Sequence, residues 1–293
     1  MPRGRQFRVL LATDGSTAAK AATSTAIGFP WPPRSDMFVV VAKQVRVESR
    51  RSILLAALDQ TAEFVARSAA RSLARRWPDV QVHVVDTSPV DAIVREATRI
   101  GANVIVMGWR GQGAVRRFLT GSVSRGVVRR APCAVLVVRR AVRRVQHVVI
   151  GVEGSSHARR AIALITRLQP PRGGRVLLLS AIDTMRVPAQ ALAPLGTRAT
   201  VGAEVARINR RRLTRARKEI ERATKSLTAA GWRVDAKVAT GAPLRELIGA
   251  VRKKRVDLLV VGARGVTGIR HLLLGSVAEG ALNRSPVPVL IVR

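Results

Sequence analysis

The chain has 293 residues, with 52 Lys and Arg against 18 Asp and Glu and a formal net charge of +34. An apolar content of 47% is enough for two sizeable cores, yet no apolar run approaches the roughly 20 residues that a membrane helix needs. The single cysteine, Cys133, excludes a disulfide within the chain and suits a reducing compartment. Because the start of the chain runs directly into a predicted strand, we expect a soluble, untargeted, cytoplasmic protein.

The positive charge leaves two interpretations open. It is divided almost equally between the two halves of the chain, and only seven of the 52 basic residues are lysine. A nucleic-acid-binding arm would concentrate the charge in a tail, although a basic surface of this size is expected to bind polyanions non-specifically. The charge therefore indicates either an arginine-rich solvated surface or a surface selected for a polyanion or an acidic membrane.

The first half of the sequence alternates apolar strands with amphipathic helices, as in a parallel sheet covered on both faces. After the turn at Asp14, Ser16 or Thr17 is a suitable N-cap for the first helix. The predicted strands are 7–12, 37–42, 80–85, 104–107 and 134–138, and the predicted helices are 17–27, 54–73, 89–100 and 121–130. The apolar face expected for the second helix consists of Leu54, Leu55, Leu58, Phe64, Val65, Ala69 and Leu73.

The same order restarts after the arginine-rich segment 139–144, which we interpret as a linker. The predicted strands are 148–152, 176–182, 233–238, 258–261 and 287–292, with helices at 156–168, 208–227 and 243–255 and a last helix opening at Gly275-Ser276. Fifteen extra residues in this half are expected as a loop within 184–202, where prolines and glycines gather. The basic segment 208–227 is most simply the solvated face of a helix.

Two glycine motifs follow the fourth strand of each half. Gly108-Trp-Arg-Gly111 is separated by nine residues from Gly121-Ser122, and Gly262-Ala-Arg-Gly265 by nine residues from Gly275-Ser276. Ligands bind at the carboxyl ends of strands in open α/β sheets. Glycine lets the backbone approach a ligand closely, and N–H groups at a helix N-terminus bind phosphate. The recurrence favours two phosphate-binding loops over two ligand-free turns.

Two complete copies of Gly-x2-Gly-x9-Gly-Ser in two α/β halves resemble the universal stress protein superfamily of the ATP-binding type. The resemblance covers essentially the whole chain. It implies an α/β fold of two tandem Rossmann-like domains of the adenine nucleotide alpha hydrolase-like kind, residues 1–140 and 145–293. Each domain would hold a five-stranded parallel sheet in the order 3-2-1-4-5 with helices on both faces, and the domains would pair through their last strands.

The resemblance also implies which residues bind a nucleotide across strands one and four. In the first half they are Asp14 and Val41 at the nucleoside, Gly108, Arg110 and Gly111 at the ribose and first phosphates, and Gly121, Ser122 and Val123 at the outer phosphates. The equivalents in the second half are Glu153, Gly262, Arg264, Gly265, Gly275, Ser276 and Val277. Because Glu153 replaces the aspartate and adds one methylene, we expect the second site to bind differently or less tightly.

Catalysis is not expected at either motif. Neither ends in the Gly-Lys-Ser/Thr of a P-loop, no kinase signature or Ser-His-Asp grouping is apparent, and the four histidines lack metal-ligand spacing. The leading hypothesis is a stress-response sensor that holds ATP, with or without Mg²⁺, and acts through partners, as a homodimer of tandem chains. Two alternatives stay open: a polyanion-binding protein with vestigial nucleotide sites, and a slow ATPase.

Overall fold

Strands and helices alternate through both halves of the chain in this computed structural model, which describes residues 6–43, 52–110, 121–183, 198–253, 255–265 and 274–293. The first half contains β1 (Arg8–Ala12), α1 (Thr17–Gly28), β2 (Asp36–Lys43), α2 (Ser52–Ala74), β3 (Gln81–Asp86), α3 (Pro89–Arg99), β4 (Val104–Gly108), α4 (Ser122–Arg130) and β5 (Ala134–Val138). The second half contains β6 (His147–Gly151), α5 (Ser156–Thr166), β7 (Arg175–Ile182), α6 (Arg198–Ala229), β8 (Arg233–Thr240), α7 (Pro243–Lys253), β9 (Leu258–Gly262), α8 (Ser276–Arg284) and β10 (Val289–Val292). The predicted alternation is confirmed.

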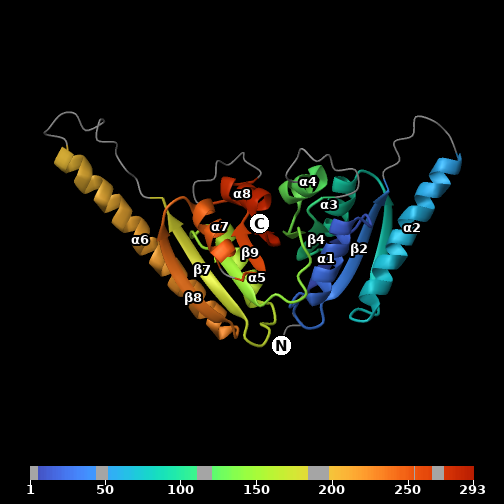
Figure 1. Cartoon of the computed structure of the whole chain (residues 1–293), viewed down its shortest axis with the longest axis horizontal. Helices are drawn as coiled ribbons and strands as arrows, with labels where there is room; N and C mark the ends of the chain where they lie inside the picture. Colours follow the sequence, from blue (N-terminus) through green and yellow to red (C-terminus); the bar gives the residue numbers. More distant parts are fainter. Residues whose placement is uncertain (1–5, 44–51, 111–120, 184–197, 254, 266–273) are drawn as a thin grey trace.

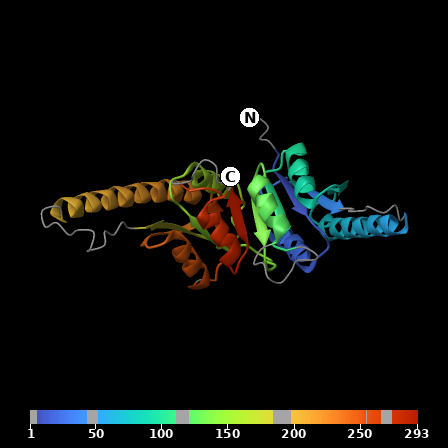
Figure 2. The same ribbon diagram turned by 90° about the horizontal axis from the view of Figure 1, so that it is seen from above.

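The ten strands in the described part of the chain belong to one sheet, in the order β3-β2-β1-β4-β5-β10-β9-β6-β7-β8. Each half is parallel and has the order 3-2-1-4-5 that the resemblance implies. The halves meet where β5 and β10 pair antiparallel, with Leu136 opposite Leu290. The expected pairing of the two last strands within the chain is therefore present, and α2 and α6 lie at opposite ends of the molecule (Figures 1 and 2).

Helices cover both faces of the sheet and bury two apolar layers. One layer lies under α1, α2, α5 and α6 and includes the fully buried Leu73 and Leu227. The other lies under α3, α4, α7 and α8 and includes Val128 and Leu282.

Cys133 is partly buried beside the second layer, and this burial raises the pKa of its thiol to about 12. A thiol in this environment suits the small apolar packing residue that the sequence predicts. Within the described residues, no helix has the length and apolar character needed to cross a membrane.

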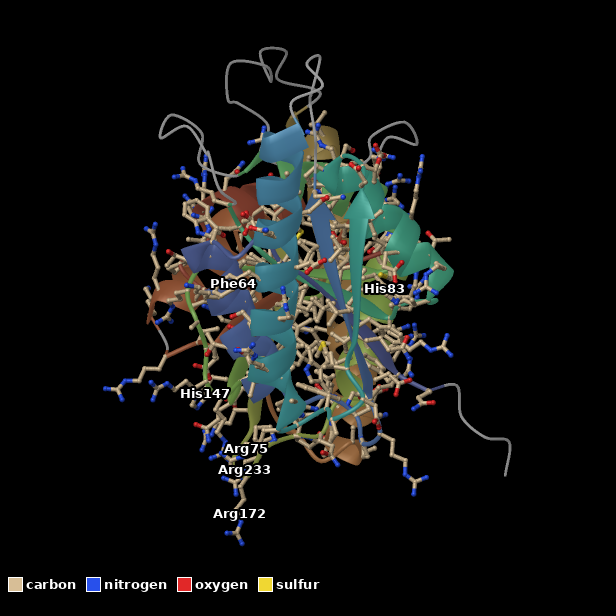
Figure 3. The ribbon with its side chains drawn as sticks, turned by 90° about the vertical axis from the view of Figure 1, so that its right-hand side faces the viewer. Phe64, Arg75, His83, His147, Arg172 and Arg233 are labelled. Carbon is tan, nitrogen blue, oxygen red and sulfur yellow. The ribbon has the colours of Figure 1, made fainter. Side chains whose placement is uncertain are left out.

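Phe64 is an incorrect prediction for the buried face of α2. Its side chain is 70% exposed and points away from the helix (Figure 3), whereas Ala62, Ala66, Ala69 and Leu73 are buried. These four follow the spacing of one helix face, and Phe64 lies two residues from Ala62, on the other side of the helix. Its partner in the predicted pattern, Val65, packs at the edge of the core. The side chains of Leu54, Leu55 and Leu58 lie outside the described residues.

Two predicted boundaries in the second half are also wrong. Residues 198–202 belong to α6 instead of a loop, because a single glycine, Gly202, costs a helix only about 1 kcal/mol; the rest of the expected loop, 184–197, lies outside the described residues. The last strand begins at Val289 instead of Val287. Pro288 has no N–H to donate to a sheet, which explains the later start.

The segment between the two halves packs against the first domain. Val142 and Val145 are buried, and the Val142 N–H donates to the Thr25 hydroxyl at 3.0 Å. A β-carbon on Gly28, at the end of α1, would lie 2.0 Å from the Arg143 carbonyl oxygen, so only glycine allows this approach. The predicted linker is thus an ordered part of the structure.

Candidate functional site

The first candidate site begins at the turn after β1. The Asp14 carboxylate accepts a hydrogen bond from the Ser16 N–H at 3.0 Å, and the Ser16 hydroxyl caps α1 by accepting from the Ala19 N–H at 3.2 Å. This confirms Ser16 as the N-cap. Val41, on the neighbouring strand, is 3% exposed and lies in an apolar layer, so its side chain belongs to the core and only its backbone can face a ligand.

Close packing brings the end of β4 beside the start of α1. A β-carbon on Gly108 would lie 2.7 Å from the backbone carbon of Ala18, so a larger residue would push the helix away. Because β1 and β4 are adjacent, with Ala12 opposite Met107, the Asp14 turn and the glycine motif share one edge of the sheet. Two of the residues predicted from the sequence are thus brought together.

The Trp109 carbonyl oxygen holds the two ends of the first motif together. It accepts from the Gly121 N–H at 2.9 Å and from the Ser124 hydroxyl at 2.9 Å. Gly121 is the N-cap of α4, and no side-chain cap is present among the described residues. The first N–H groups of the helix are therefore available to an anion. Ser122 is exposed and Val123 packs against the core, whereas Gly111 lies outside the described residues.

Arg110 belongs to a cluster around the Trp109 ring. The Arg110 guanidinium carbon lies 4.2 Å from the ring centroid, and that of Arg139 lies 4.3 Å from it. Burial lowers the pKa of Arg139, and the nearby charge of Arg110 lowers that pKa further. Two guanidinium groups therefore place positive charge beside the predicted phosphate loop. Sequence reasoning missed Trp109 and Arg139; a tryptophan between the motif glycines of a chain with only 3% aromatic residues was the available signal.

The second motif has the same backbone arrangement without the tryptophan. The Gly275 N–H donates to the Ala263 carbonyl oxygen at 2.8 Å, and Gly275 is the N-cap of α8. A β-carbon on Gly262 would lie 2.9 Å from the β-carbon of His157 at the start of α5. Ser276 is exposed and Val277 packs against the core, as in the first half.

Glu153 distinguishes the second site from the first. Its Oε2 lies 2.7 Å from the position that a β-carbon on Gly265 would occupy, so the carboxylate reaches across to the second motif. The Ser155 hydroxyl lies 2.9 Å from Glu153 Oε1 and 3.2 Å from the Arg264 carbonyl oxygen, and can donate to one of them at a time. Glu153 is exposed as a whole, yet partial desolvation of its carboxyl group raises its pKa, against the opposing effect of the hydrogen bond from Ser155.

The helix that faces the first turn of each half also differs. A β-carbon on Gly15 would lie 2.8 Å from Val65 of α2. In the second half, a β-carbon on Gly154 would lie 3.0 Å from Glu219 and 3.5 Å from Arg215 Nε, both of α6. One apolar side chain facing the turn in the first half is thus replaced by charged side chains in the second.

The gathered groups are suited to binding an anion. The first site combines backbone N–H groups, one carboxylate and guanidinium charge, which together resemble a phosphate cradle with a polar group at its other end. Within the described residues, no group of three His, Cys, Asp or Glu side chains lies close enough together to hold a metal ion.

Comparison with known proteins gives one consistent family. The model of the universal stress protein family matches residues 7–139 and again residues 144–293. A universal stress protein of Mycobacterium tuberculosis is 28% identical over 235 residues, which cover 75% of this chain and 71% of that protein. One from Thermus aquaticus is 31% identical over 146 residues, which cover 50% of this chain and 97% of that protein. The crystal structure of a universal stress protein from Archaeoglobus fulgidus is similar in fold, with a TM-score of 0.63, 19% identity and 98% of both chains covered.

Proposed function

Because the chain belongs to the universal stress protein family, we propose that it is an ATP-binding regulator that acts through partners and has no strong catalytic activity. The observation that carries this proposal is the hydrogen bond from the Gly121 N–H to the Trp109 carbonyl oxygen. It holds Gly121, the N-cap of α4, beside the end of β4. The N–H groups of the first helical turn suit the outer phosphates of a nucleotide.

The remaining residues of the first site fit the rest of the nucleotide. The Asp14 carboxylate can accept a hydrogen bond from a ribose hydroxyl, and the backbone at Val41 can meet the base. Positive charge from Arg110 and Arg139 favours the phosphates. Mg²⁺ would enter bound to the phosphates of ATP.

The two sites are expected to bind with different strength. The Glu153 carboxylate lies against Gly265, where it takes up space and, when ionised, repels phosphate. The first half has the shorter Asp14, which accepts a hydrogen bond from its own turn. We therefore expect tighter ATP binding in the first half.

Weak catalysis follows from the same groups. Phosphoryl transfer needs a positioned nucleophile and usually a carboxylate that organises a metal ion. In the proposed binding mode, Asp14 and Glu153 lie at the nucleoside end of the nucleotide, remote from its last phosphate. Phosphate release is thus expected to be slow.

Native mass spectrometry of the freshly purified protein tests the proposal. Wild type should carry up to two adenine nucleotides per chain, and G121V/G275V should carry none, because a side chain at Gly121 would lie 3.0 Å from the Trp109 carbonyl oxygen and one at Gly275 3.3 Å from that of Ala263. The single variants assign each nucleotide to its half.

A matched control is G202V/G249V, since a β-carbon at either position meets nothing within 4 Å. Unchanged nucleotide binding by G121V/G275V, or equal loss in the control, would contradict the proposal.

The same spectra give the oligomeric state, for which we expect a homodimer of tandem chains. We expect the protein in the cytoplasm, a reducing compartment that suits its single thiol.

A further inference from the structure

An open groove with a volume of about 460 Å³ lies along α6. Thr214 and Glu219 line it together with six basic residues: Arg207, Arg210, Arg211, Arg215, Lys218 and Arg222. The basic residues recur at helical spacing on one face, and at 1.5 Å per residue they span about 22 Å. The groove is therefore a strip of positive charge long enough to meet several phosphate groups.

Four of these cations are available to a ligand. Arg207 bonds Glu204 at 2.6 Å, and Arg222 bonds Glu219 at 3.2 Å. Four further side chains are exposed and form no ion pair within the described residues: Arg210, Arg211, Arg215 and Lys218. We refer to these four residues as the groove cations.

A chain-wide bias toward arginine does not account for the groove. Between 207 and 222, α6 has eight basic and two acidic residues. The equivalent stretch of α2 in the first half, residues 53–68, has one basic and two acidic residues. A bias in composition would act on both helices, so the charge on α6 is a local property.

The chemistry of the lining identifies the kind of ligand. Arginine forks match phosphate oxygens. Proteins that bind single strands usually also stack bases on aromatic side chains, and the described lining has none, so contact here would be with the sugar–phosphate backbone alone. The apolar side of α6, including Ile220 and Leu227, is buried against the sheet, so this helix lacks the apolar face that inserts into a membrane surface. The groove cations form one strip along the helix, like the positively charged grooves that follow the backbone of a single strand.

We infer that this groove binds the sugar–phosphate backbone of single-stranded nucleic acid, independently of base sequence. The ligand lies along one face of α6, at an end of the molecule (Figures 1 and 2). Arg215 also adjoins the turn at Gly154, so one end of the groove meets the edge of the second candidate site. The inference does not depend on nucleotide binding there.

Fluorescence anisotropy with a labelled oligothymidylate of about 15 nucleotides tests the inference. The variant R210Q/R211Q/R215Q/K218Q removes the groove cations and keeps good helix formers. Single strands give a slope of log K against log salt of about −0.7 per phosphate contact, so the variant should lower the magnitude of that slope by about 3. Affinity should fall at least tenfold at about 0.1 M salt.

The matched control is R75Q/R172Q/R175Q/R233Q, which removes four charges from exposed positions. Figure 3 shows Arg75, Arg172 and Arg233 pointing away from the lower end of the ribbon, and none of the four lines the groove. The control should bind like wild type, and circular dichroism should show both variants folded. Equal loss in both variants would mean that net charge alone drives binding and would overturn the inference. Equal binding of a duplex or of anionic vesicles, or full displacement by a hundredfold excess of ATP, would overturn it as well.

Discussion

At the scale of single residues, Glu153 shows how one methylene changes a site. Asp14 is held by its own turn, whereas the Glu153 carboxylate reaches the second motif and loses water there. The substitution was visible in the sequence and predicted a changed site. The direction in which the Glu153 side chain points was not predictable. It depends on the position of Gly265, which follows β9 and is far from Glu153 in the sequence.

The raised pKa of Glu153 predicts a stability that depends on pH. The folded protein binds this proton more tightly than the unfolded chain, so ionisation lowers the free energy of unfolding as pH rises above the ordinary value near 4.3, and the loss is complete above the folded pKa. E153Q cannot ionise. Its melting temperature should exceed that of wild type at about pH 7 and match it at about pH 4.

Glu221 supplies the control for this comparison. Lys225 lowers the pKa of this exposed carboxyl through a hydrogen bond, so E221Q should lose a small stabilisation near neutral pH. Equal melting temperatures of wild type and E153Q at neutral pH would show that the carboxylate is well solvated.

At the scale of helices and strands, the sequence predicts the type and order of every element and the position of both glycine motifs. It fails where a contact joins residues far apart in the chain. Trp109 and Arg139 meet only because β4 pairs with β5, and Arg139 then reaches the end of α8, where it donates to the carbonyl oxygens of Leu282 at 2.5 Å and Asn283 at 3.0 Å. Local periodicity contains no signal for this contact.

Arg139 should therefore contribute to stability through three interactions. R139Q loses the contact with the Trp109 ring and charge-assisted bonds to two carbonyl groups at the end of α8. We expect the free energy of unfolding to fall by about 1–3 kcal/mol, measured by urea titration. R140Q, at an exposed neighbour, should stay within about 0.5 kcal/mol of wild type. A similar loss in both variants would assign the effect to the segment as a whole.

At the scale of the molecule, the seam between β5 and β10 removes two apolar sheet edges. All five residues of β5 are buried, as are all four of β10. The outer edge of the sheet at β8 carries the exposed Asp235 and Lys237, which discourage pairing with another chain. The seam thus pairs the two apolar inner edges, whereas charge protects the outer edge at β8.

Separated halves should reveal those edges. Residues 1–140 and 145–293, produced apart, are each expected to self-associate, and mixing them should yield a one-to-one complex. Size-exclusion chromatography with light scattering measures the masses. Two halves that stay monomeric and do not combine would show that the seam contributes little.

The ordered segment after β5 has a consequence for how the two halves can change. Because the segment links the two halves, their association is intramolecular, with an effective concentration of the order of millimolar. Each chain therefore always pairs two halves of different sequence. In an assembly of two identical chains, every substitution is repeated across the seam. Here a tryptophan stands at position 109 where its counterpart is Ala263, and Val65 stands where its counterpart is Glu219. Covalent fusion therefore permits a division of labour, in which one domain keeps an ancestral binding site while the other takes on a different ligand.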